Sequence, residues 1–145
     1  MATLQGQRRW FGLASRVVGL VLATSVSLTA QTSVSAGEQN HSLKDAADGL
    51  RTNAEDMVAH GGMGDAKAIL HHCGEAARYA EVLIKQLPAS HARREEGVAS
   101  LNDVIRYCKR VSEIGVHADP GVLLNPAIKA RAAARASVST LGLLK

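Results

Sequence analysis

The sequence predicts an all-α protein, an antiparallel four-helix bundle built from two repeated helical hairpins. Three observations lead to this prediction. Apolar residues recur with the 3.6-residue period of an α-helix along most of the chain after residue 36. Aromatic residues make up only 3% of the chain, so small aliphatic side chains must fill the interior, which favours closely packed helices over a β-sandwich. A segment of the first hairpin also recurs 47 residues later, and short links between helices predict antiparallel neighbours.

Residues 1–36 have the pattern of a cleaved signal peptide. A basic stretch precedes an apolar run that starts at residue 17, and small residues at 34–36, or at 28–30, would suit the cleavage site. The run is too short and too rich in Ser and Thr to span a bilayer, so we expect a periplasmic or secreted protein without a stable membrane span; an uncleaved anchor is the alternative. The segment Arg8-Arg9-Trp10-Phe11 resembles a twin-arginine signal, which leaves the export route open.

Removal of this segment changes how the charge is interpreted. Arg8, Arg9 and Arg16 leave with it, so the formal net charge of +4 falls to about +1 in the mature chain, which does not predict a nucleic-acid partner. The remainder, residues 37–145, is long enough for one core. No acidic residue follows Asp119, and we interpret the basic residues beyond it as a solvated helix face; contact with an acidic surface is the alternative. These basic residues are Lys129, Arg131, Arg135 and Lys145.

The first predicted hairpin covers about residues 42–87. Its first helix should begin at Ser42, which with Asp45 resembles a capping box, and end at the glycine turn 61–64. Its second helix should begin after the N-cap Asp65 and stop before Pro88. The apolar stripes are Leu43, Ala47, Leu50, Ala54, Met57 and Val58 in the first helix and Ala66, Ile69, Leu70, Cys73, Ala76, Ala77, Ala80, Leu83, Ile84 and Leu87 in the second.

The second predicted hairpin covers about residues 89–143. The segment 101–107 resembles 54–60, so the third helix should repeat the first. The fourth helix should begin near Asn125-Pro126, because proline is tolerated at the first helical position, which leaves a long inner loop over about 112–124. The apolar faces are Val98, Leu101, Val104, Ile105, Cys108 and Val111, then Ala127, Ala130, Ala134, Val138 and Leu141.

Polar residues at seven-residue steps run along both helices of the first hairpin, on the sides that should face each other. Asn53 and His60 lie on one helix, and Asp65, His72 and Tyr79 lie on the next. Imidazole and carboxylate groups bind transition metals, so the candidate metal ligands are His60, Asp65, His71 and His72. The alternative is ordinary solvated surface, with His60 favoured by the helix dipole alone.

Cys73 and Cys108 lie on apolar stripes and should sit at the same height on adjacent helices. Because disulfides persist outside the cytoplasm, we predict a Cys73–Cys108 disulfide. Two alternatives stay open: a pair of buried thiols, or thiolates that join His72 as soft ligands for copper.

Motifs of catalysis are missing from the sequence: it has no haem-attachment motif, phosphate loop or nucleophile elbow. Paired Glu-x-x-His motifs of a di-iron bundle are missing too. We therefore expect a binding protein rather than an enzyme, and interpret Glu55, Asp56 and Asp103 as solvated helix charges.

The stretch from Asn53 to Ala80 resembles the small metal-binding protein family, periplasmic histidine-rich four-helix bundles of bacteria. The family repeats His-Ala-Glu-Glu-Ala-x-x-His, where residues 53–60 here read Asn-Ala-Glu-Asp-Met-Val-Ala-His and residues 70–75 read Leu-His-His-Cys-Gly-Glu. The second copy, residues 100–107, reads Ser-Leu-Asn-Asp-Val-Ile-Arg-Tyr. The resemblance covers nearly all of the mature chain.

The resemblance implies periplasmic binding of divalent transition metals (copper, nickel or zinc) for scavenging or storage. Only His60 and His72 match family histidines, and Asp65 can still act as a ligand, so the second hairpin would have lost its site. The positions where the family would have histidine are Asn53, Asp65, Tyr79, Ser100, Tyr107 and Pro126. The alternative function is a non-metal helical bundle that binds an unidentified periplasmic protein, for example in envelope stress.

Overall fold

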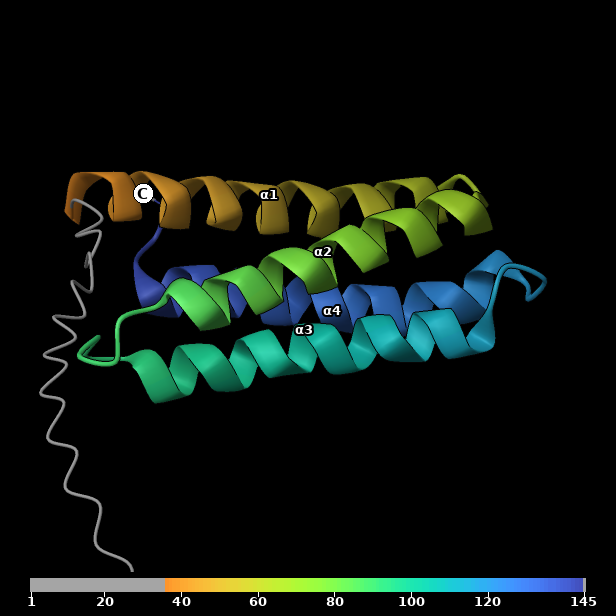
Figure 1. Cartoon of the computed structure of the whole chain (residues 1–145). Helices are drawn as coiled ribbons and strands as arrows, with labels where there is room; N and C mark the ends of the chain where they lie inside the picture. Colours follow the sequence, from red (N-terminus) through yellow and green to blue (C-terminus); the bar gives the residue numbers. More distant parts are fainter. Residues whose placement is uncertain (1–35, 145) are drawn as a thin grey trace, which may run out of the picture. The chain divides into compact units, whose positions relative to one another are not determined.

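The structure is a computed structural model that describes residues 36–144, with side chains from residue 42 onward. The predicted signal peptide and its cleavage sites therefore lie outside the described residues, apart from Ala36. The described chain consists of four helices: α1 (Ala36–Gly62), α2 (Ala66–Gln86), α3 (Arg94–Ile114) and α4 (Pro120–Leu141). They pack as an antiparallel bundle in which α1 also contacts α4, which confirms the predicted fold class (Figure 1).

The turn between α1 and α2 matches its prediction closely. The α1 helix ends at Gly62, and Gly64 takes a positive φ of 79°, which glycine adopts without steric strain. Asp65 is the N-cap of α2, and its Oδ1 accepts a hydrogen bond from the backbone N of Ala68 at 2.9 Å. Sequence and structure agree here because the signals are local: a glycine turn followed by a capping acid.

Two predicted helix starts are wrong. The α1 helix begins at Ala36, because residues 38–44 contain no proline or glycine to stop it, so Ser42 lies inside the helix and is no N-cap. Its Oγ donates a hydrogen bond to Gln86 Oε1 at 3.1 Å instead. The α4 helix begins at Pro120, where Asp119 Oδ1 accepts from the backbone N of Gly121 at 2.7 Å, so Pro126 lies inside the helix and the inner loop is short.

Small and aliphatic side chains form the core, as predicted. The largest fully buried apolar side chains are Leu50, Met57, Ile69, Leu83, Leu101, Leu123, Val104 and Val111. Buried Ser137 satisfies its hydroxyl by donating to the Ala134 carbonyl at 2.8 Å. Alanine and glycine at the contacts allow the helices to approach closely.

A disulfide joins Cys73 on α2 to Cys108 on α3, with the two Cα atoms 5.2 Å apart. It links the two hairpins at the predicted height and confirms the predicted pairing. No cysteine of the chain is left as a thiol, so the buried-thiol alternative is wrong. In the part of the chain that the structure describes, none of the helices has the length and apolar content to cross a membrane.

Candidate functional site

Three of the four predicted metal ligands lie together near the α1–α2 turn. His60 is in the last turn of α1, and His71 and His72 are in the second turn of α2. The rings of His60 and His72 stack, with centroids 5.1 Å apart and planes 11° from parallel. The rings of His71 and His72 meet edge to face, also at 5.1 Å between centroids. We call these three residues the histidine cluster.

Asn53 orients His72 by a hydrogen bond across the hairpin. The Asn53 amide nitrogen donates to the Gly49 carbonyl at 2.9 Å, which fixes the amide orientation. Asn53 Oδ1, an acceptor, then lies 3.0 Å from His72 Nδ1, so Nδ1 must carry the proton. In the neutral ring this tautomer leaves the lone pair on Nε2, the atom that a metal ion would use.

The surroundings of His72 favour its neutral form. Burial lowers the pKa of His72 below its usual value, the charge of Asp56 raises it, and His60 and His71 lower it further. The net shift is downward, so His72 keeps its lone pair to lower pH than a solvated histidine does. Asp56, interpreted from sequence as a solvated charge, thus acts electrostatically on the cluster. One indication of this role is visible in the sequence, because Asp56 precedes His60 by four residues, about one helical turn.

Asp65, the fourth predicted ligand, has a different role in the structure. Its carboxylate caps α2, and the residue is exposed. The histidine cluster also does not converge: among residues 42–144 no three His, Cys, Asp or Glu side chains are placed to hold one metal ion. Because Cys73 and Cys108 are oxidised, they offer no thiolate to His72, and the third sequence interpretation, soft thiolate ligands, does not apply to this state.

Glu55 is not the solvated charge that the sequence suggested. Its Oε1 and Oε2 accept hydrogen bonds from Arg135 Nε at 2.6 Å and Nη2 at 2.8 Å, and Arg131 lies 3.6 Å away. The hydrogen bond from Arg135 lowers the pKa of the Glu55 carboxyl. Two of the basic residues beyond Asp119 therefore tie α4 to α1 across the bundle.

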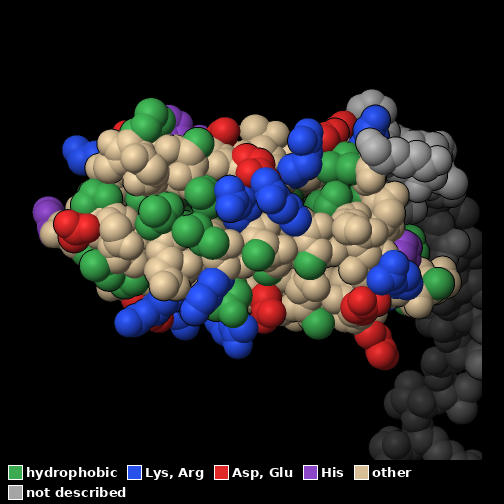
Figure 2. Space-filling view, turned by 180° about the vertical axis from the view of Figure 1, so that it is seen from behind, with side chains coloured by type: hydrophobic (Ala, Val, Ile, Leu, Met, Phe, Trp, Pro, Cys, Tyr) green, Lys and Arg blue, Asp and Glu red, His purple; other side chains and the backbone are tan. Residues whose placement is uncertain are grey.

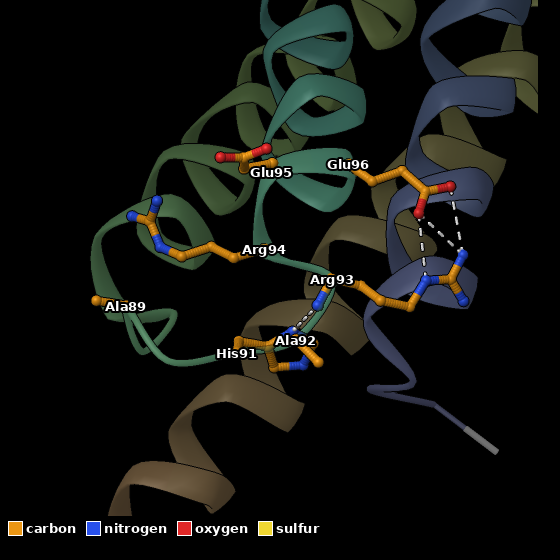
Figure 3. Close-up of a pocket in the computed structure, with 7 residues that line it drawn as sticks. All are labelled: Ala89, His91, Ala92, Arg93, Arg94, Glu95 and Glu96. Carbon is orange, nitrogen blue, oxygen red and sulfur yellow. Dashed lines mark hydrogen bonds and ion pairs between the residues drawn. The ribbon is translucent and has the colours of Figure 1, made fainter.

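A surface hollow of about 480 Å³ lies at the α2–α3 turn, at the other end of α2 from the histidine cluster (Figure 3). His91 Nδ1 accepts from the backbone N of Arg93 at 3.3 Å, and Arg93 pairs with Glu96 at 3.1 Å. Figure 3 shows the Arg93 and Glu96 side chains turned toward each other. Arg93 and Glu96, two of the charged residues that line this hollow, are therefore paired with each other.

Comparison of the chain with protein-family models, with curated proteins and with solved structures finds no match.

Proposed function

We propose that this protein binds a divalent transition-metal ion (copper, nickel or zinc) through the histidine cluster, as a periplasmic scavenging or storage protein rather than an enzyme. The observation that carries the proposal is the Asn53–His72 hydrogen bond beside the stacked His60 ring. It leaves Nε2 of His72 available, next to two further imidazoles. The resemblance to the small metal-binding protein family supports the same assignment.

His60 and His72 are the primary ligands in this proposal, and His71 supplies a third nitrogen. Side-chain rotations must bring the nitrogens together, because the stacked rings do not aim their in-plane lone pairs at one point. Rotation is feasible at His71, which is exposed, and at His60, which is partly exposed at the end of α1. Asp65 and the nearby Asp56 contribute negative charge that favours a cation.

Calorimetric titration of the signal-free protein with Cu(II), Ni(II) and Zn(II) tests the proposal. We expect a dissociation constant in the micromolar range or tighter for at least one metal. His60→Ala with His72→Ala should weaken it by about 10-fold or more, and Asn53→Ala by about 10-fold, because the orienting partner of a ligand typically matters that much. The matched control is His91→Ala with His117→Ala, two histidines outside the cluster. If wild type and the His60/His72 variant bind equally, the proposed site is wrong.

A further inference from the structure

A second surface lies on the other hairpin, and it consists of three adjoining hollows across α3 and α4. The central one, of about 320 Å³, lies in the seam between the helices and contains Tyr107 and Pro126. It shares Tyr107 and Arg110 with a hollow of about 510 Å³ on α3. It shares Asn125 and Lys129 with a hollow of about 390 Å³ on α4. We call the three together the basic groove.

The floor of the basic groove is apolar and open to solvent. Val122 is 54% exposed and Ile128 is 42% exposed. Within residues 42–144 only one other large hydrophobic side chain, Met63, is comparably exposed, and it lies in the α1–α2 turn. Ile114 adds partly buried apolar surface to the central hollow. Two of the three exposed large hydrophobic side chains among the described residues therefore lie in the basic groove. Exposed apolar surface with a polar rim is typical of binding sites.

Cations line the rim of this apolar floor: Arg106, Lys109, Arg110 and Lys129. Arg106 and Arg110 have acidic neighbours, Asp103 at 2.9 Å and Glu113 at 3.4 Å. Lys109 and Lys129 make no ion pair with any other residue that the structure describes. Figure 2 shows Lys and Arg side chains gathered at the lower left, over α3, with hydrophobic side chains above them over α4.

We propose that the basic groove binds an acidic amphipathic segment of a partner protein. Its apolar side chains would cover Val122 and Ile128, and its carboxylates would face Lys109 and Lys129. The charge complementarity selects an acidic partner. The three hollows connect from α3 through the seam to α4, and connected hollows fit side chains that project from a peptide, as in helix-in-groove recognition. Tyr107, with Arg106 4.9 Å above its ring, adds the residue types that dominate such interfaces. This proposal does not depend on metal binding.

Fluorescence anisotropy provides the test, with a fluorescein-labelled synthetic helix of leucine and glutamate, the leucines spaced three and four apart. We expect saturable binding by the signal-free protein that weakens as salt rises. Val122→Ser with Ile128→Ser, and separately Lys109→Glu with Lys129→Glu, should each weaken it by about 10-fold or more. The matched controls lie on the other hairpin: Met63→Ser, and Lys44→Glu with Lys67→Glu, should leave it unchanged. Circular dichroism confirms that every variant folds.

Three outcomes would overturn the proposal. The first is the absence of saturable binding of the leucine–glutamate helix. The second is equal weakening by the groove variants and the control variants, which would indicate a nonspecific charge effect. The third is co-sedimentation with phosphatidylglycerol vesicles that depends on Val122, Ile128, Lys109 and Lys129 while the peptide does not bind, which would assign the surface to lipid.

Discussion

Hairpin one (α1 and α2) and hairpin two (α3 and α4) have the same design and different surfaces. In each, a glycine on the first helix receives a side chain of the second: Tyr79 packs over Gly49 in hairpin one, and Leu141 over Gly97 in hairpin two. The disulfide joins them at mid-height. The sequence repeat, however, aligns His60 of hairpin one with Tyr107 of hairpin two, so the two hairpins differ at this position.

The two hairpins differ in side chains that lie at their surfaces. His60 lies against His72, but Tyr107 lies beside Pro126 in the open central hollow of the basic groove. His60, His72 and Tyr107 are partly exposed, and Pro126 is the buried one of the four. The apolar stripe beneath them is small and aliphatic in both hairpins. One scaffold thus presents a cluster of nitrogen donors on one hairpin and a basic, apolar groove on the other.

The largest expected effect on stability comes from removing the disulfide that joins the two hairpins. The cysteines are 35 residues apart in sequence, and a disulfide that closes a loop of this size lowers the entropy of the unfolded chain. We expect Cys73→Ala with Cys108→Ala to lower the free energy of unfolding by about 3–4 kcal/mol, measured by urea denaturation. Reductant should destabilise the wild type and leave this variant unchanged. Equal stability of the two proteins would show that packing alone holds the hairpins together.

The next largest effect on stability tests whether the two helices approach each other equally closely in both hairpins. A Cβ at position 49 would lie 2.5–2.8 Å from three ring atoms of Tyr79, and one at position 97 would lie 2.6 Å from Leu141 Cγ. Overpacking should outweigh the gain in helix propensity, so Gly49→Ala should cost about 1–2 kcal/mol in chemical denaturation. Gly97→Ala should cost less, because Leu141 ends the last helix and can shift.

Gly74→Ala is the matched control for both glycines. Gly74 is an exposed helical residue, and an added Cβ there meets no atom within 4 Å. It should stabilise the protein by about 1 kcal/mol through helix propensity alone. Stabilisation at Gly49 equal to that at Gly74 would contradict the close approach of α1 and α2.

Local signals explain what the sequence could predict. The N-cap Asp65 and the α1–α2 turn depend on adjacent residues, and the Cys73–Cys108 pairing follows from two helical stripes of known period. The start of α4 was mispredicted because two prolines, Pro120 and Pro126, offered alternative first turns, and the Asp119 cap decided between them.

Long-range electrostatics explain what the sequence could not predict. Glu55 and Arg135 are 80 residues apart, so no periodicity links them before the bundle brings α1 against α4. The four predicted metal ligands came from spacing, and three of them do lie together, as the histidine cluster. Asp65 does not join the histidine cluster because its carboxylate accepts a hydrogen bond from a free N–H in the first turn of α2.

The smallest expected effect on stability comes from the ion pair between Glu55 of hairpin one and Arg135 of hairpin two. The hydrogen bond from Arg135 lowers the pKa of the Glu55 carboxyl below 4.5, so folding favours the ionised form. Its contribution is therefore complete above about pH 4.5 and is lost as pH falls through the pKa of the folded state.

Glu55→Gln should thus lower the melting temperature slightly near pH 7, by less than either glycine substitution does, since solvent screens the pair through Arg135, which is 59% exposed. At about pH 3 the difference from wild type should shrink, because protonation of Glu55 leaves the wild type with an uncharged side chain at this position, as the variant has at every pH. Glu81→Gln, an exposed acid of hairpin one without an ion pair among the described residues, serves as control. A constant difference across this pH range would mean that the charge of Glu55 does not hold hairpin one to hairpin two.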